Sequence, residues 1–147
     1  MTTPPATLAQ FGYTLAYAER TLTATLRRHL AARNVQPETW YALRLIAGGS
    51  PGLAREALNH DLEESRTMNA DSTRELLAGL EAEGLIRGDR EVDLTDKGET
   101  LYRSLRDYIA SPTAQLLGQF DADDVQTTIR TLDAIAKHAA EELAVAN

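Results

Sequence analysis

The sequence predicts a mainly α-helical fold, in which a winged helix-turn-helix with a short β-hairpin wing lies between long N- and C-terminal helices. Apolar residues recur every three or four positions near both ends of the chain, which is typical of long amphipathic helices. Three shorter helical patterns fill residues 37–84, and apolar and charged residues alternate in the segment that follows. A helix, a short helix, a helix and a hairpin within fewer than sixty residues is the order of a winged helix-turn-helix.

The first two helices are predicted from apolar spacing and from proline and glycine positions. The stripe of the first helix consists of Leu8, Phe11, Leu15, Ala18, Leu22, Leu26 and Leu30. Pro37 suits the first turn of the second helix, because its missing N–H would have no helical partner there, and Gly48-Gly49 ends that helix. Its buried side would be Trp40, Leu43, Ile46 and Ala47.

The third and fourth helices precede the hairpin. Ser50-Pro51 predicts the start of a short third helix, whose inward residues would be Leu53, Ala54, Ala57 and Leu58. The fourth begins between Ser65 and Asp71 and ends at Gly84, because glycine commonly follows the last helical residue. Residues 85–87 and 90–94 then form two strands, joined by a two-residue turn at Gly88-Asp89.

The last two helices carry apolar faces that the small central core cannot cover. Thr95 or Asp96 should cap a fifth helix through about Ala110, with Asp96 and Glu99 at capping-box spacing, and Ser111-Pro112 interrupts or kinks it. Asp121 should cap a sixth helix, whose apolar residues repeat every seven positions. A second copy of the chain is the simplest cover for these faces, so we expect a homodimer.

Composition narrows the class of protein. The 147 residues suffice for one domain with its own core, and no apolar run is long enough to span a membrane. The first residues lack the basic region of a secretory signal, so a cytoplasmic protein without membrane attachment is expected. The absence of cysteine excludes thiolate zinc sites and cysteine nucleophiles. The net charge of −7 argues against general affinity for nucleic acid.

No pattern in the sequence indicates an enzyme. His29, His60 and His138 lie on three different elements without ligand spacing, so no metal site is expected. Residues 48–52 are a turn between helices and lack the Lys-Ser/Thr pair of a phosphate-binding loop. Neither a nucleophile elbow nor a dinucleotide fingerprint is present, so no catalytic residue and no cofactor are predicted.

Several short motifs in this order resemble the MarR family of bacterial transcriptional regulators. They are the segments 37–43 (PETWYAL), 80–86 (LEAEGLI), the pair Asp89-Arg90 and 94–98 (LTDKG). The resemblance spans nearly the whole chain and implies a single domain over residues 1–147. Its winged helix-turn-helix lobe would occupy about 37–98, and its dimerisation helices about 5–35 and 99–147.

The resemblance implies a homodimer that binds double-stranded DNA at a palindromic operator. Two recognition helices would enter successive major grooves about 34 Å apart, and the wings would reach the minor grooves. Carried over by position, the DNA-contacting residues would be Arg66, Asn69, Asp71, Ser72, Arg74, Arg87 and Arg90. Arg74 suits a guanine edge and Asn69 an adenine edge. The equally open alternative for Arg74 and Arg90 is pairing with nearby carboxylates on the surface.

The resemblance also implies a small-molecule pocket, which would make the protein a ligand-responsive repressor. Tyr13, Tyr17, Trp40 and Tyr41 are the candidate lining residues, although aromatic residues at helical spacing are more often core. Arg20 or Arg44 would suit a carboxylate, so the expected effector is a small aromatic or carboxylate compound.

A second function class remains open because of charge and wing length. Residues 51–98 carry six basic and twelve acidic side chains, so −6 of the net −7 lies on the block expected to bind DNA. Glu75 falls where an arginine or a neutral polar residue is expected, and the wing is shorter than is usual in the family. The alternative is a MarR-fold module that binds a ligand or a protein and has lost general DNA affinity.

Overall fold

The computed structural model describes residues 2, 4–66 and 68–146, with side chains for all of them except Ser65 and Arg66. Its elements are α1 (Pro5–Ala31), α2 (Pro37–Gly48), β1 (Leu53–Ala54), α3 (Arg55–Arg66), α4 (Ala70–Ala82), β2 (Ile86–Arg87), β3 (Glu91–Leu94), α5 (Asp96–Leu117) and α6 (Ala122–Ala146). The mainly helical winged fold is therefore confirmed. The chain forms two compact units, one up to Asp107 and one from Tyr108 onward, and each is described by itself.

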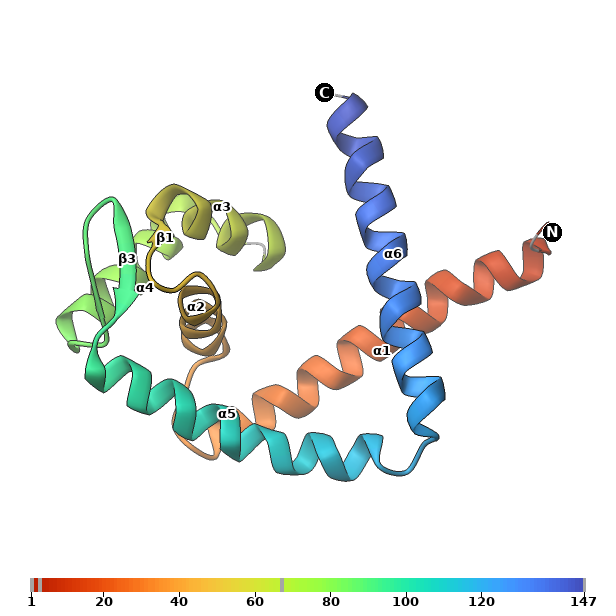
Figure 1. The fold of residues 1–147 in the computed structure, drawn as a ribbon, viewed down its shortest axis with the longest axis horizontal. Helices are drawn as coiled ribbons and strands as arrows, with labels where there is room; N and C mark the ends of the chain where they lie inside the picture. Colours follow the sequence, from red (N-terminus) through yellow and green to blue (C-terminus); the bar gives the residue numbers. More distant parts are fainter. Residues whose placement is uncertain (1, 3, 67, 147) are drawn as a thin grey trace. The chain divides into compact units, whose positions relative to one another are not determined.

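The core of the first unit is built around α2. This helix contacts α1, α3, α4 and β3, which explains why it is buried on several sides (Figure 1). Its buried residues are Trp40, Tyr41, Ala42, Leu43 and Ile46. They pack with apolar residues from the surrounding elements, which are Leu30, Leu58, Leu62, Leu77, Leu80, Leu85, Ile86, Val92 and Leu105. Burial of these side chains is the main force that holds the unit together.

The sheet has three antiparallel strands in the order β1-β3-β2. Leu53 and Ala54 pair with Val92 and Glu91, so the prediction that they lie inside a helix beginning at Pro51 is wrong. The third helix instead begins at Arg55, after Gly52 with a φ of +155°. Ala54 and Ala57 are exposed, contrary to their predicted inward orientation. Residues 53 and 54 form a strand because they pair with β3, which lies far along the chain. Local apolar spacing does not indicate such pairing.

The turn of the wing is also longer than predicted. Arg87 pairs with Asp93, which leaves five residues between the paired positions instead of a two-residue turn at Gly88-Asp89. The outer half of β3 pairs with β1, and only its inner half pairs with β2. Gly88 has a φ of +106°, and a Cβ there would lie 1.9 Å from the carbonyl oxygen of Glu91. A glycine is therefore required where the wing turns.

The motif at residues 94–98, one of those that predicted the fold, joins the end of α4 to the start of α5. Gly84 ends α4 with a φ of +76°, as predicted. The hydroxyl of Thr95 donates to the carbonyl oxygen of Gly84 and accepts from the backbone N–H of Gly98, so Thr95 is the residue that caps α5. Lys97 Nζ donates to the carbonyl oxygen of Glu83 at 2.8 Å. Because Thr95, and not Asp96, is the N-cap, Asp96 and Glu99 do not stand in the capping-box positions, and Glu99 pairs with Arg103.

The proline in α5 does not end the helix. The helix runs without a break to Leu117, so the predicted end near Ala110 and the interruption at Ser111-Pro112 are wrong, while the alternative of a kink stays a prediction. Proline removes one backbone hydrogen bond, and the hydroxyl of the next residue, Thr113, donates to the carbonyl oxygen of Ile109 at 3.0 Å. The helical turns before and after Pro112 keep α5 continuous despite the missing hydrogen bond.

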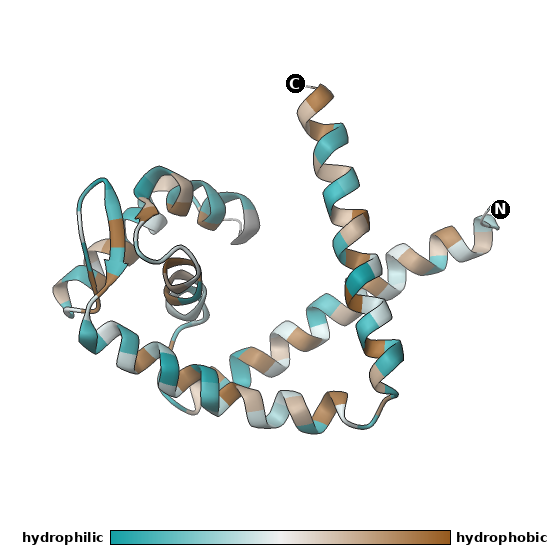
Figure 2. Ribbon diagram, viewed as in Figure 1, coloured by the Kyte–Doolittle hydropathy of each residue, from teal (hydrophilic) through white to brown (hydrophobic). Residues whose placement is uncertain are grey.

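The second unit contains the end of α5 and all of α6. Asp121 caps α6 as predicted, since its Oδ1 accepts from the backbone N–H groups of Asp123 at 2.8 Å and Asp124 at 3.3 Å. Apolar residues recur along α6 and, in the first unit, along α1 (Figure 2). In the described part of the chain, no helix is both long and apolar enough to cross a membrane.

Candidate functional site

The exposed face of α4 carries three of the predicted site residues, Asp71, Ser72 and Arg74, together with Glu75. Asp71, Ser72, Arg74 and Glu75 are exposed, whereas the buried side of the helix consists of Thr73, Leu77 and Leu80. The amphipathic pattern therefore predicted correctly which side of this helix is free. A helix with one polar face free and the other packed on a lobe has the geometry needed to enter a DNA groove.

Asn69 begins α4 as its N-cap. Its Oδ1 accepts a hydrogen bond from the backbone N–H of Ser72 at 2.8 Å. A bidentate contact with adenine needs the amide oxygen as well as the amide N–H group. The cap uses that oxygen, so the structure gives Asn69 a role in starting the helix that the base-contact prediction did not include.

Arg74 is paired with a carboxylate on its own helix. Its Nη2 lies 3.1 Å from Oδ1 of Asp71, and the two side chains are 75% and 81% exposed. An exposed pair of this kind contributes about 0–1 kcal/mol to stability. The pair can therefore separate at low cost when a phosphate or a base competes for the guanidinium.

The wing presents two further arginines. Arg87 ends β2, and Arg90 lies in the turn before β3; both side chains are exposed. Within the described part of the chain, neither has an ion pair or a side-chain hydrogen bond. Arg66 is the last residue of α3, and its side chain lies outside the described residues, so its predicted phosphate contact stays a prediction.

Two basic residues of the lobe are committed to its own backbone. Arg55 donates to the carbonyl oxygens of Gly88 and Asp89 and pairs with Glu81, while Lys97 binds the carbonyl oxygen of Glu83. Sequence analysis assigned no role to Arg55. No local motif marks it, because its partners lie 26 to 34 residues further along the chain.

The four predicted ligand-binding aromatic residues have different environments. Trp40 and Tyr41 are each 5% exposed and belong to the core, whereas Tyr13 and Tyr17 are 71% and 54% exposed on α1. The Trp40 ring stacks on Tyr102 with centroids 5.7 Å apart and an interplanar angle of 15°. None of the four lines any of the cavities described below, so their ligand role stays a prediction.

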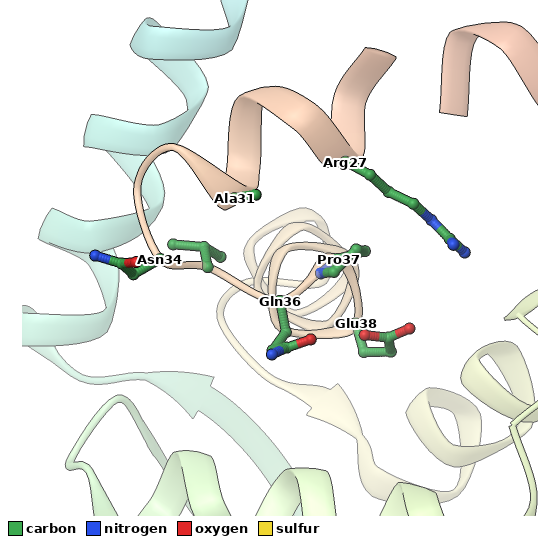
Figure 3. Close-up of a pocket in the computed structure, with 7 residues that line it drawn as sticks. Arg27, Ala31, Asn34, Gln36, Pro37 and Glu38 are labelled. Carbon is green, nitrogen blue, oxygen red and sulfur yellow. The ribbon is translucent and has the colours of Figure 1, made fainter. Parts of the chain in front are cut away.

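Besides one of about 390 Å³ between α3 and α4, two cavities of the first unit have volumes typical of small-molecule sites. One, of about 550 Å³, lies where α1 leads into α2, and Arg27 and Glu38 extend to the same side of it while Asn34 points away (Figure 3). The other, of about 330 Å³, lies between α2, β3 and α5. It is lined in part by Tyr102, Arg103 and Arg106. Among the described residues, no three His, Asp or Glu side chains are grouped to hold a metal ion.

Several solved structures with the same fold are MarR family proteins. A MarR of Staphylococcus aureus in complex with salicylate and kanamycin is 20% identical, with a TM-score of 0.77 over 94% of this chain and 95% of that one. A MarR family protein from Bacillus stearothermophilus is 19% identical, with a TM-score of 0.76 over 95% and 99%. A MarR family protein of Mycobacterium tuberculosis in complex with DNA is 19% identical, with a TM-score of 0.68 over 91% and 98%.

The sequence comparisons found no such similarity. No family model and no curated protein matches the chain. At 19–20% identity, these neighbours show that the chain has the MarR fold.

Proposed function

We propose that this chain, which has the fold of the MarR family, is a homodimeric DNA-binding transcriptional regulator that responds to a small ligand. The observation that carries the proposal is the exposed polar face of α4, next to a wing whose two arginines have no ion pair among the described residues. In this fold, the corresponding helix and wing are the parts that meet DNA, and one structural neighbour is a complex with DNA. A protein that acts on DNA would work in the cytoplasm.

The residues divide into those that read bases and those that bind phosphate. Arg74 projects from the middle of the exposed face of α4, where a guanidinium can bind the O6 and N7 atoms of guanine. Arg87 and Arg90 would bind the backbone or a narrow minor groove. Ser72 and Asp71 would lie beside Arg74, and Asp71 would restrict which contacts Arg74 makes.

Dimerisation is supported by apolar side chains that the single chain leaves exposed. On α1 they include Leu8, Phe11, Leu15 and Leu22, and on α6 they include Ile129, Ile135 and Leu143. Large apolar side chains exposed along a helix of a small protein are typical of an interface. A two-fold dimer would present two α4 helices to the two halves of a palindromic operator.

Ligand control is supported by the cavities of the lobe and by the neighbour that holds salicylate and kanamycin. A ligand would release DNA by favouring a dimer in which the two α4 helices no longer match successive grooves. Its effect is limited by the difference between its affinities for the two states. A small aromatic carboxylate remains our proposed class, because the cavity beside Tyr102 is lined by two arginines.

The proposal is tested by fluorescence anisotropy with labelled fragments from upstream of the protein's own gene. We expect binding that depends on sequence and weakens with salt, and release upon addition of salicylate as the probe. Arg74→Ala should reduce discrimination between operator and shuffled DNA, whereas Arg90→Ala should lower both affinities and reduce the salt slope by about one. Absence of sequence-dependent binding even at low salt would reject the regulator.

A second function is favoured by the charge of the lobe. Of the six basic residues between positions 51 and 98, Arg55 and Lys97 bind the protein's own backbone and Arg74 is paired with Asp71. A lobe with so few uncommitted cations fits a module that binds a ligand or a protein partner and has no general DNA affinity. The same titration decides, because such a module would bind salicylate without binding any DNA fragment.

A further inference from the structure

Arg55 holds three separate parts of the lobe together. Its Nε donates to the carbonyl oxygen of Asp89 at 2.6 Å, and its Nη2 donates to the carbonyl oxygen of Gly88 at 2.7 Å. The same Nη2 lies 2.6 Å from Oε1 of Glu81, on α4. Its backbone N–H donates to the carbonyl oxygen of Arg90 at 2.8 Å. One residue at the start of α3 therefore binds three consecutive wing carbonyls and the recognition helix.

The wing turn is shaped to offer those carbonyls. Gly88 has a φ of +106°, a conformation that side-chain-bearing residues rarely adopt, and the chain then reverses before β3 begins at Glu91. No strand pairing covers residues 88–90, since β1 and β2 pair with β3 only at positions 91–94. Arg55 supplies the contacts that strand pairing does not supply at this point.

The acidic partner lies on the helix that carries Arg74. Glu81 is seven residues, or about two helical turns, beyond Arg74. The pair is only partly exposed, with the Arg55 side chain 27% accessible and the Glu81 side chain 44%. A planar guanidinium can hold a carboxylate and two carbonyls at once in fixed directions, whereas the single ammonium of lysine cannot fix that geometry.

We infer that Arg55 is a positioning residue that fixes the wing turn, residues 88–90, relative to α4, so that Arg90 and Arg74 meet DNA together. The inference rests on the proposed DNA binding. Arg55 itself makes no DNA contact in this assignment, because its Nε and Nη2 groups already serve the wing and Glu81. Its effect on affinity acts through the placement of Arg90.

The test compares Arg55→Lys with Arg130→Lys. Both changes keep a positive charge, but the described side-chain contact of Arg130 is with Thr127 on its own helix, α6. The readout that needs no DNA is limited trypsin cleavage after Arg87 and Arg90, identified by mass. Arg55→Lys should raise that cleavage rate about tenfold, because a loosely held segment opens locally more often, and Arg130→Lys should leave it unchanged. Thermal unfolding of both variants checks that the lobe remains folded.

DNA binding is then measured on the same variants. Arg55→Lys should weaken operator binding about tenfold and reduce the salt slope by about one, because Arg90 no longer reaches its phosphate. Glu81→Gln should change both readouts in the same direction by less. A loosened wing with unchanged affinity would overturn the inference, and so would unchanged cleavage. If the wild-type protein binds no DNA at all, the proposed function fails, while the cleavage assay still reports whether Arg55 holds the wing.

Discussion

At the scale of single residues, the fold depends on a glycine where two backbone segments lie too close for a side chain. Gly98 is buried in the first turn of α5, and a Cβ there would lie 1.9 Å from the carbonyl oxygen of Leu85. Thr95 and Lys97 complete this contact between the end of α4 and the start of α5. The motif at residues 94–98 is thus explained by packing, which is why it predicted the fold and not DNA binding.

Gly98→Ala should therefore lower the free energy of unfolding by about 1–3 kcal/mol, because a methyl group must displace backbone. Gly79→Ala is the matched control, since nothing lies within 4 Å of a Cβ at that exposed helical position. The control should stabilise the protein by about 0.5–1 kcal/mol. Urea unfolding monitored by circular dichroism measures both, and equal effects would contradict this account of Gly98.

Charge at one residue, Asp71, should limit DNA affinity. Asp71→Asn frees Arg74 and removes a negative charge from the exposed face of α4, so we expect operator affinity to rise about two- to fivefold. Asp133→Asn is the control, because it removes an equal charge and an exposed pair with Lys137 on α6. Anisotropy titrations at two salt concentrations compare them; an equal rise in both variants would indicate a net-charge effect.

At the scale of elements, α4 depends on the cap that begins it. Asn69 was predicted to contact adenine, and the structure shows its Oδ1 bound to the backbone N–H of Ser72. The residue type was informative, since asparagine is common both at helix N-caps and at adenine contacts. Only the backbone geometry separates these two roles.

Asn69→Ala should reduce the free energy of unfolding by about 1 kcal/mol, whereas Asn69→Ser, which keeps a capping oxygen, should stay within about 0.5 kcal/mol of the wild type. If capping is the main role, the serine variant should also keep operator affinity within about twofold, which is less than the loss of a base contact. Chemical unfolding and anisotropy give the two values. If Asn69→Ser unfolds with normal stability but binds the operator about tenfold more weakly, then Asn69 contacts a base, as first predicted.

At the scale of the whole molecule, exposed apolar residues on α1 and α6 support the proposed dimer. Leu15 is 44% exposed on α1, and Leu143 is 67% exposed on α6. Burying such residues between two chains would supply free energy that a single chain does not obtain.

We expect the wild-type chain to sediment as a dimer, and Leu15→Glu to shift it towards monomer by placing a charge in the interface. Thr14→Glu is the control, because it adds the same charge at an exposed polar position on the same helix. Analytical ultracentrifugation measures the association, and circular dichroism checks the fold. A monomeric wild-type protein, or equal dissociation by both variants, would refute the dimer.

The sequence by itself determined the order of the helices, the cap of α6, the end of α4 and the exposed face of α4, because apolar spacing, Asp121 and Gly84 act through neighbours a few residues away. Tertiary structure decided the third strand, the true start of α3 at Arg55, the wing turn and the burial of Trp40 and Tyr41 while Tyr13 and Tyr17 stay exposed. Each of these depends on partners far along the chain, as in the bond from Arg55 to the carbonyl oxygen of Asp89, 34 residues away. The local sequence pattern does not indicate such distant partners.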